Sequence, residues 1–293
     1  MEFDLILRLI ETQGINSIEH IAEPLISCPA PALDGNPDEI AALESHLRNR
    51  GYAAHHVHEY PARHYHVTYG HSTQPLVSII IPTKDQLPLL RRCVESLLEK
   101  TRYFNYEVII VDNNSQERDS ITWLAEINAI GGQKIRVLSY PHPFNFSAIN
   151  NFAVGHAHGE YLVLLNNDTM IIQEDWLDEL LNHAQRPEVG IVGAKLLYPS
   201  GYIQHAGVIT GLGGPAGHPF IGLPAAAHGY MQRLIVDQNY NVVTAACLMI
   251  RRSVYDDVLG MDEEHFKVSY NDVDLCLKVG AQGYLTVWTP RAV

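Results

Sequence analysis

The chain has 293 residues, of which 46% are hydrophobic and 18% are charged, and its formal net charge is −13 at pH 7. This length is enough for one large domain and a smaller one, because domains average roughly 150 residues. The 33 acidic side chains outnumber the 20 basic ones, which argues against a nucleic-acid binder, since neutralising phosphates requires a basic surface. No apolar run approaches the ~18 residues that span a bilayer, so any membrane contact is expected to be peripheral.

Residues 1–74 are predicted to form a small α+β region. Apolar residues at positions 3, 6, 7 and 10 have helical spacing. Residues 22–36 contain three prolines and are typical of a linker. The sequence Asn36-Pro37-Asp38-Glu39 then predicts an N-cap, a first-turn proline and a capping acid, opening a helix that Gly51 closes.

Two short strands are expected at 52–60 and 64–69, on either side of Pro61. Six histidines lie in and beside these strands: His55, His56, His58, His64, His66 and His71. A metal site is one interpretation, but their alternation favours solvent-facing strand positions. The four cysteines, Cys28, Cys93, Cys247 and Cys276, include no closely spaced pair, which indicates reduced thiols of a cytoplasmic protein rather than a zinc site or a disulfide framework.

From residue 75 onward, predicted strands and helices alternate. The strands are expected at 76–81, 107–111, 135–139 and 161–165, and the helices at 87–100, 117–128 and 147–157. This alternation predicts right-handed crossovers and a mostly parallel sheet. The first strand runs into Pro82-Thr83-Lys84-Asp85-Gln86 rather than a Gly-rich phosphate loop, which argues against a dinucleotide dehydrogenase and a P-loop NTPase.

Acidic residues follow two of these strands. Asp112 comes directly after the strand at 107–111, and the strand at 161–165 runs into Asn166-Asn167-Asp168. Parallel sheets bind ligands at the carboxyl ends of their strands, so the two carboxylates are expected to converge on one site. The alternative is that Asn166-Asn167-Asp168 is an ordinary turn, since Asn and Asp are common turn formers.

A third acidic cluster, Asp272 and Asp274, opens a predicted helix after a buried strand expected within 242–250. Acidic residues at a helix N-terminus are favoured by the helix dipole, so these residues could simply cap the helix. Their occurrence together with the two strand-end acids favours a functional role.

Five segments together resemble the bacterial family 2 glycosyltransferases, and most closely the branch found in O-antigen and other surface-polysaccharide assembly. The segments are Pro82-Thr83-Lys84-Asp85, Val111-Asp112-Asn113-Asn114-Ser115, Phe144-Asn145-Phe146-Ser147-Ala148-Ile149-Asn150-Asn151, Leu165-Asn166-Asn167-Asp168 and Asn271-Asp272-Val273-Asp274. The resemblance covers residues 75–293 and implies an α/β GT-A fold, a Rossmann-like and mostly parallel sheet flanked by helices, behind the N-terminal region.

The resemblance implies that a nucleoside-diphosphate sugar is the donor and that Thr83 and Asp112 contact its nucleotide. The full expected donor-binding set is Pro82, Thr83, Asp85, Asp112, Asn114, Asn151, Asn166 and Asn167. Asp168 stands at the last acid of the family's Asp-x-Asp motif and is expected to hold Mg²⁺ or Mn²⁺ on the diphosphate. Asn166 replaces the first acid, and Asn150 replaces the arginine of the family's Arg-Asn pair.

By the same resemblance, Asp272 is the base of an inverting transfer to a saccharide or lipid-linked acceptor, and Asp274 contacts that acceptor. The leaving nucleoside diphosphate gains negative charge while an acceptor hydroxyl loses its proton on the opposite face, so metal and base need separate carboxylates. His205 and His218 flank the Gly-rich segment 211–217, which is either a mobile acceptor loop or a plain surface loop. His218 is the expected acceptor contact there.

Two other functions are also considered for this sequence. One is a sugar-phosphate nucleotidyltransferase, which would be expected to carry a basic Gly-rich loop after its first strand. The other is a non-catalytic nucleotide-sugar or carbohydrate-binding module of the same fold. Family members usually have a metal-binding histidine several residues after the Trp288-Thr289-Pro290 segment, whereas this chain ends at Val293. A truncated chain with an incomplete metal site is therefore expected. The location expected for such an enzyme is the cytoplasm, at the inner face of the cell membrane.

Overall fold

The computed structural model describes residues 2–14 and 34–293, together with the isolated positions 19, 21, 23, 25 and 27. Cys28 and most of the predicted linker at 22–36 lie outside the described residues. The chain divides into two compact units, Met1–Ser72 and Thr73–Val293. The boundary expected from the sequence lies two residues later, between positions 74 and 75.

The first unit contains two helices and one hairpin: α1 (Glu2–Gln13), α2 (Pro37–Asn49), β1 (His56–Glu59) and β2 (Tyr65–Thr68). The Asn36 side chain accepts a hydrogen bond from the Asp38 N–H and caps α2, as its sequence predicts. The Glu39 carboxylate accepts hydrogen bonds from Arg63 and Tyr65 of the hairpin and also interacts with Asn36, the N-cap residue. Within the described ranges, no three His, Cys, Asp or Glu side chains group as a metal site.

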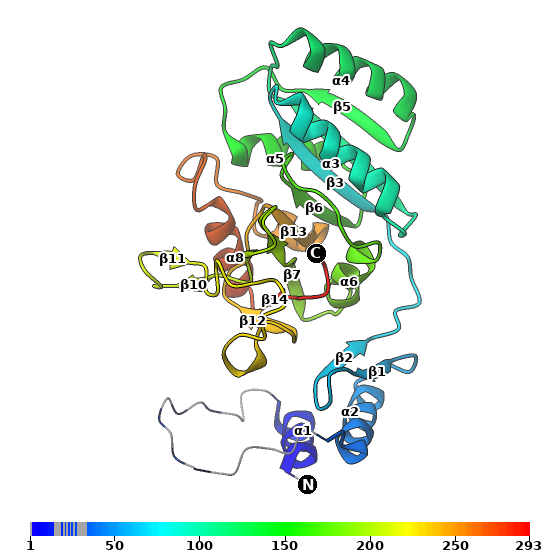
Figure 1. Cartoon of the computed structure of the whole chain (residues 1–293), viewed down its shortest axis with the longest axis vertical. Helices are drawn as coiled ribbons and strands as arrows, with labels where there is room; N and C mark the ends of the chain where they lie inside the picture. The colour runs from blue at the N-terminus through cyan, green and yellow to red at the C-terminus, as the bar shows by residue number, and fades with distance from the viewer. Residues whose placement is uncertain are drawn as a thin grey trace. The chain divides into compact units, whose positions relative to one another are not determined.

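The second unit is built on one eight-stranded sheet with the strand order β12-β14-β7-β13-β6-β3-β4-β5 (Figure 1). Its strands are β3 (Val77–Thr83), β4 (Tyr106–Asp112), β5 (Ile135–Ser139), β6 (Tyr161–Leu165), β7 (Val189–Gly193), β12 (Gln238–Tyr240), β13 (Cys247–Arg251) and β14 (Leu285–Trp288). The four strands from β6 to β5 are parallel to their neighbours, as is β14 to β7. In contrast, β13 runs antiparallel to both β6 and β7.

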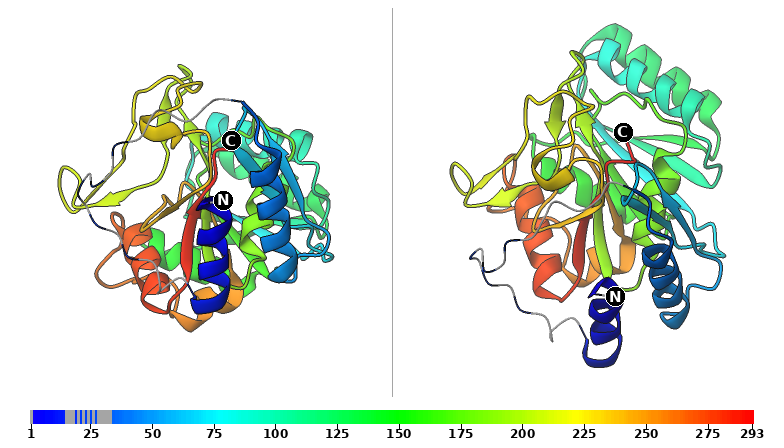
Figure 2. Two further views of the ribbon diagram at one scale, coloured as in Figure 1. Left: turned by 90° about the horizontal axis from the view of Figure 1, so that it is seen from below. Right: turned by 60° about the horizontal axis from the view of Figure 1, so that its bottom comes forward.

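Helices cover both faces of this sheet (Figure 2). Residues of α3 (Leu87–Lys100), α4 (Arg118–Gly131) and α6 (Trp176–Ala184) pack into one hydrophobic core with Ile79 and Ile81. Residues of α5 (Phe146–His156), α7 (Arg252–Asp257) and α8 (Asn271–Ala281) pack into the other core with Ile80. Successive side chains of a strand point to opposite faces, so the continuous apolar run of β3 is explained by burial on both sides.

The strand expected within 242–250 is only partly correct. β13 begins at Cys247, and residues 242–246 approach it without ladder pairing to a neighbouring strand. Val242 and Val243 are fully buried, which accounts for the strand-like apolar pattern. The peptide groups of Ala245 and Ala246 bond instead to Asp272 and to the turn after β6.

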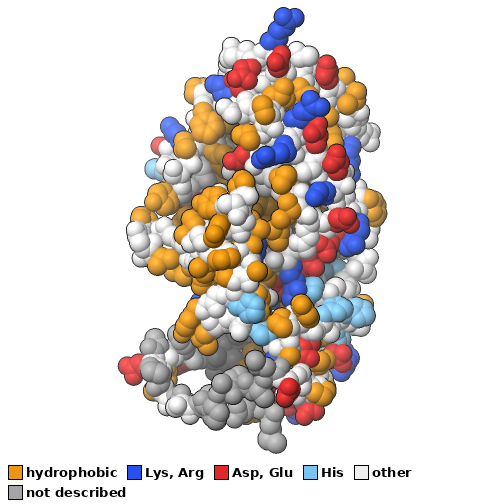
Figure 3. Space-filling view, viewed as in Figure 1, with side chains coloured by type: hydrophobic (Ala, Val, Ile, Leu, Met, Phe, Trp, Pro, Cys, Tyr) orange, Lys and Arg blue, Asp and Glu red, His pale blue; other side chains and the backbone are white. Residues whose placement is uncertain are grey.

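A long insertion between β7 and β12 carries only short elements: β8 (Leu196–Leu197), β9 (Ile203–His205), β10 (Ile209–Thr210), β11 (Ala216–Gly217) and the 3₁₀ turn η2 (Tyr230–Gln232). Hydrophobic side chains gather over the β10–β11 region on the face shown in Figure 3. The exposed large apolar residues of the insertion include Tyr202, Leu212, Ile221, Leu223, Tyr230 and Met231.

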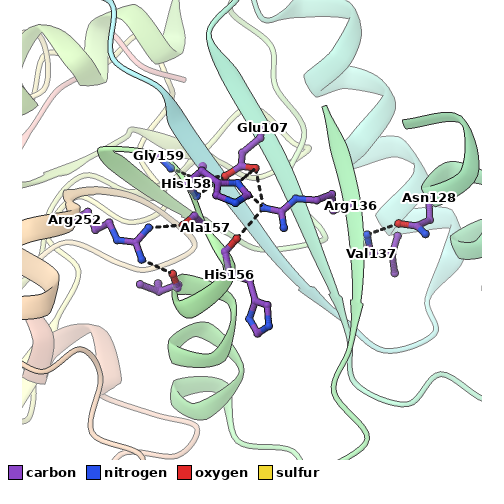
Figure 4. Close-up of polar contacts among 11 residues, drawn as sticks. Glu107, Asn128, Arg136, Val137, His156, Ala157, His158, Gly159 and Arg252 are labelled. Atoms are coloured by element: carbon purple, nitrogen blue, oxygen red, sulfur yellow. Dashed lines mark hydrogen bonds and ion pairs between the residues drawn. The ribbon is translucent and has the colours of Figure 1, made fainter. Parts of the chain in front are cut away.

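A buried ionic cluster lies at the amino ends of the parallel strands, away from the ends that carry Asp112 and Asp168 (Figure 4). Glu107 accepts hydrogen bonds from Ser78 Oγ at 2.6 Å, the His158 N–H at 2.7 Å and Arg136 Nη2 at 2.8 Å. Burial raises the pKa of Glu107, but these hydrogen bonds outweigh it and lower the pKa to about 2. A cavity of about 590 Å³ borders the cluster. It lies at the amino ends of β3 and β4, away from the strand-end acids.

Candidate active site

The carboxyl ends of β3, β4 and β6 form one polar edge. Thr83, the last residue of β3, lies opposite Asp112, the last residue of β4. The Asn166-Asn167-Asp168 turn follows β6, which pairs with β3 on its other side. Asn167 Nδ2 donates a hydrogen bond of 3.0 Å to Thr83 Oγ1. The side chains that follow three separate strands are thus connected at one edge of the sheet.

Asp112 has one occupied and one available carboxylate oxygen. Its Oδ1 accepts hydrogen bonds from the Ser115 N–H at 3.0 Å and from Ser115 Oγ at 2.5 Å. Its Oδ2 makes no hydrogen bond to any residue that the structure describes. The next residue, Asn113, is 2% exposed and donates to the carbonyls of Tyr140 and His142. Asp112 therefore lies at the end of β4, directly before a loop that these hydrogen bonds hold in place.

Three other residues of the expected donor-binding set lie beside it. Pro82 is part of β3, in register with Val111. Asp85 Oδ1 accepts from the backbone N–H groups of Gln116 and Glu117, at 2.7 and 2.8 Å, so this carboxylate stabilises the start of α4. Asn114 is exposed and adopts a left-handed conformation with φ of 62°. Of the three, Asp85 has a clear structural role.

Segment 244–246 joins the turn after β6 to the third acidic cluster. The Asn166 N–H donates to the Ala246 carbonyl oxygen at 3.1 Å, and the neighbouring Ala245 N–H donates to Asp272 Oδ2 at 3.2 Å. The turn that contains Asp168 and the Asp272 carboxylate are therefore held by backbone groups of two consecutive residues, Ala246 and Ala245. This explains how residues about a hundred positions apart in the sequence come together at the same edge.

Asp272 does not cap α8. The N-cap position is Tyr270, which has a φ of 60° and makes no side-chain capping bond. Asp272 lies in the first turn of the helix, where its Oδ1 accepts from the Val273 N–H at 2.9 Å. Because Asp272 also bonds to segment 244–246, its carboxylate faces the sheet edge. Its role is therefore not limited to stabilising the first turn of α8.

Asp274 and Asn151 are engaged within the protein. Asp274 forms an ion pair of 3.1 Å with Lys278 one turn later in α8. Asn151 Nδ2 donates to the Met261 carbonyl oxygen and to Glu263 Oε1, and its Oδ1 accepts from the Met261 N–H. The Asn151 amide thus fixes α5 against the loop before α8. Asn151 therefore has a structural role, and its donor contact stays a prediction.

Lys195 is buried and bonds to the backbone. It is 7% exposed, and its Nζ donates to the Ala225 carbonyl oxygen at 2.7 Å. Burial lowers its pKa. Trp176 is 1% exposed and its Nε1 donates to Thr101 Oγ1, so it packs α6 onto the sheet.

His218 lies near Asp272, and a second histidine supports it. His205 has no exposed surface, and its Nδ1 lies 3.0 Å from His218 Nδ1. His218 is exposed. The loss of hydration on the covered side of its ring lowers the pKa of His218, and the negative charge of Asp272 opposes this shift. In the sequence, His205 is recognisable only as a flank of the Gly-rich segment, because nothing there pairs it with His218.

The residues at the edge suit a hard divalent cation that is shared with a substrate. Asp168 is exposed and offers one carboxylate, next to two asparagine amides. Mg²⁺ and Mn²⁺ sites of this kind use one or two carboxylates plus substrate phosphates and water. No group of three acidic, histidine or cysteine ligands occurs in the part of the chain that the structure describes, so the substrate would have to complete the coordination.

The sequence model of glycosyl transferase family 2 matches residues 78–259, which include the ends of β3, β4 and β6. The chain belongs to this family. The predicted family, the GT-A fold and the class of enzyme, a glycosyltransferase domain, are therefore confirmed.

Two relatives of the family match nearly the whole chain. An uncharacterized protein of Sinorhizobium fredii, y4gI, is 46% identical over 302 residues, covering 99% of this chain and 33% of the relative. The O-antigen biosynthesis protein RfbC of Myxococcus xanthus is 41% identical over 302 residues, covering 98% of this chain and 23% of the relative. The chain thus spans between about a quarter and a third of the length of these proteins.

Solved glycosyltransferases share the fold at low sequence identity. A mannosyltransferase of Pyrobaculum calidifontis, solved with GDP-Man and Mn²⁺, superposes with a TM-score of 0.57 at 16% identity, covering 76% of this chain and 56% of that chain. GalNAc-T7, solved with UDP, GalNAc and Mn²⁺, superposes with a TM-score of 0.62 at 14% identity, covering 74% and 42%. Both structures therefore hold a nucleotide and a divalent cation on a fold of this kind.

None of the described helices of this family member is long and apolar enough to cross a bilayer.

Proposed function

We propose that the second unit is an inverting glycosyltransferase domain that transfers a sugar from a nucleoside-diphosphate donor to a saccharide acceptor. The observation that carries the proposal is the connected polar edge: Asp112 beside Thr83, Thr83 bonded to Asn167, and the turn of Asp168 linked through segment 244–246 to Asp272. Donor binding and proton removal require carboxylates in separate positions within one site, and this edge supplies them.

The nucleoside end of the donor is assigned to Thr83 and Asp112. Asp112 Oδ2 is available, and Ser115 holds Oδ1 in place. An ionised carboxylate accepts strong hydrogen bonds from the N–H groups of a base or the hydroxyls of a ribose. Asn166 and Asn167 lie between this position and Asp168, where they can contact the ribose and the phosphates. Pro82 and Asn114 border the nucleoside position.

The diphosphate end of the donor is assigned to Asp168 with Mg²⁺ or Mn²⁺. The two solved neighbours contain Mn²⁺ together with a nucleotide, and the donor atoms around Asp168 suit such a cation. When bound, the cation neutralises the charge that grows on the leaving nucleoside diphosphate. Asn150 cannot replace the cationic side chain of the Arg-Asn motif, so this chain depends more heavily on the cation.

The acceptor is placed on the side of Asp272 and His218. Asp272 accepts the proton of the attacking hydroxyl, and the Ala245 and Val273 N–H groups hold its carboxylate in position. Asp274 is a supporting acid whose charge Lys278 balances. Inversion by single displacement requires the acceptor oxygen and the leaving diphosphate on opposite sides of the sugar, and the proposal assigns them to Asp272 and Asp168, two separate carboxylates of the edge.

The acceptor is proposed to be a lipid-linked saccharide of surface-polysaccharide synthesis, reached at the inner face of the cell membrane. The relative from Myxococcus xanthus is named an O-antigen biosynthesis protein. The exposed apolar residues of the insertion, which also carries His218, offer a surface for peripheral lipid contact. Replacing Leu212, Tyr230 and Met231 by serine should reduce sedimentation with uncharged phosphatidylcholine vesicles without lowering nucleotide affinity.

A panel of nucleoside diphosphates tests the proposal directly. With Mn²⁺ present, at least one of UDP, TDP, GDP and ADP should raise the melting temperature of the chain, and EDTA should remove most of that increase. A non-catalytic module would bind the donor as well but would not release nucleoside diphosphate from it in the presence of an acceptor. No stabilisation by any nucleotide would contradict the proposal.

A further inference from the structure

The pair of His205 and His218 joins two hairpins of the insertion. His205 ends β9 and is completely buried, whereas His218 follows β11 and is exposed. Their Nδ1 atoms lie 3.0 Å apart, and their ring planes meet at 79°. A hydrogen bond at this distance needs one Nδ1 atom to carry a hydrogen and the other to accept it.

The surroundings of His205 decide which ring carries that hydrogen. His205 Nε2 faces the backbone N–H groups of Gly207 and Thr244, at 3.4 and 3.5 Å. Both groups are donors, so Nε2 must accept and cannot carry a hydrogen. Burial lowers the pKa of His205 to about 3, and the ring is therefore neutral. Its single N–H is on Nδ1, and it donates to His218 Nδ1.

The tautomer of His218 follows from this bond. Since His218 Nδ1 accepts from His205, the neutral His218 ring carries its hydrogen on Nε2. An Nε2 atom that already holds a hydrogen can donate to an oxygen but cannot take a proton from a hydroxyl. His218 is therefore suited to binding the acceptor and leaves proton removal to Asp272.

The same backbone segment holds both His205 and Asp272. The Thr244 N–H donates to His205 Nε2, and the next N–H, of Ala245, donates to Asp272 Oδ2. Adjacent peptide groups thus fix the buried histidine and the proposed base relative to each other. The negative charge of Asp272 also acts on His218, so the exposed ring and the carboxylate lie within electrostatic range.

We propose that His205 is a positioning residue that fixes His218 as a hydrogen-bond donor through Nε2, and that His218 then binds an oxygen atom of the saccharide acceptor beside Asp272. This inference rests on the proposed function for the identity of the acceptor. The fixed tautomer itself follows from the hydrogen bonds alone.

Long-range ¹H–¹⁵N correlation spectra of the histidine-labelled chain test the tautomers without any turnover. The variants His205→Asn and His218→Gln assign the two rings by the loss of their signals. The expected spectrum has unprotonated nitrogens at His205 Nε2 and His218 Nδ1. A hydrogen on His218 Nδ1 would overturn the proposal.

Acceptor kinetics test the role in binding. The acceptors are octyl glycosides of glucose, N-acetylglucosamine and rhamnose, and His205→Leu should raise the acceptor KM roughly 3- to 10-fold, the range of one neutral hydrogen bond. His205→Asn keeps an N–H donor near the Nδ1 position and should restore most of the wild-type KM. His228→Leu, at an exposed position of the same insertion, should match the wild type.

Different results would contradict the acceptor role of the histidine pair and the proposed function. Equal acceptor KM values for wild type and His205→Leu, with unchanged nucleotide affinity and circular dichroism, would overturn the acceptor role. If the wild type transfers sugar to no glycoside, the proposed function is contradicted for these acceptors, and the spectra still decide whether His205 sets the tautomer of His218.

Discussion

Asp112 and Asp168 stand at the ends of parallel strands on the same edge, but their surroundings give them different tasks. Asp112 is half-buried and is oriented by Ser115, which suits a directional hydrogen bond to a nucleoside. Asp168 is exposed on a turn, which suits a ligand of a hydrated cation. Substitutions at the two positions should therefore affect different parts of the donor.

Asp112→Ala should weaken the binding of the nucleoside as well as the nucleotide. A hydrogen bond to an ionised group contributes about 1.5–3 kcal/mol, or roughly a 10- to 100-fold change in Kd. Calorimetry with uridine, thymidine and guanosine measures the effect, and Asp119→Ala, at an exposed position of α4, is the matched control. A loss confined to the metal-dependent part of nucleotide binding would contradict the assignment of Asp112.

Asp168→Ala should remove the metal-dependent part of nucleoside-diphosphate binding and leave nucleoside binding intact. The expected loss is about tenfold or more, because a bound cation contributes several kcal/mol to holding the phosphates. Titrations with and without EDTA measure it, with Asp257→Ala at an exposed position as the control. Identical wild-type affinities in Mn²⁺ and in EDTA would rule out a metal at Asp168.

At the scale of the elements, the loops at the sheet edge are fixed by hydrogen bonds between side chains and backbone. Asp85 was expected to bind the donor, yet its carboxylate accepts two backbone N–H groups at the start of α4. The sequence places Asp85 correctly after β3 but cannot show its partners, because Gln116 and Glu117 follow a different strand. The strand expected within 242–250 is wrong over 242–246 for the same reason, since the backbone of this segment bonds to Asp272 and to the turn after β6.

Asp85→Ala should lower the free energy of unfolding by about 1 kcal/mol, the usual effect of losing a carboxylate that caps a helix. Urea denaturation measures this, and Lys84→Ala, at the exposed neighbouring position, should change the unfolding free energy by less than half as much. A strong loss of nucleotide affinity at unchanged stability would instead restore the donor-binding role to Asp85.

At the scale of the whole molecule, the sequence predicts the fold well where burial produces a regular pattern. The apolar runs of β3, β4 and β6 and the spacing of α3 predict the parallel half of the sheet. The shared position of the residues at the strand ends is predicted from these parallel strands, since their carboxyl ends lie at one edge of the sheet. The insertion between β7 and β12 could not be predicted, because its short hairpins depend on tertiary contacts such as the pair of His205 and His218.

The central claim is that the edge combines donor binding with an acceptor base, and Asp272→Asn tests it most directly. Asparagine keeps an oxygen that can accept from the Ala245 N–H but cannot take a proton from the acceptor. Turnover should fall roughly 10²- to 10⁴-fold, while the Kd for the nucleoside-diphosphate donor stays close to that of the wild type. Near-normal turnover of Asp272→Asn, measured with an acceptor that the wild type glycosylates, would contradict the account and make Asp274 the next candidate for the base.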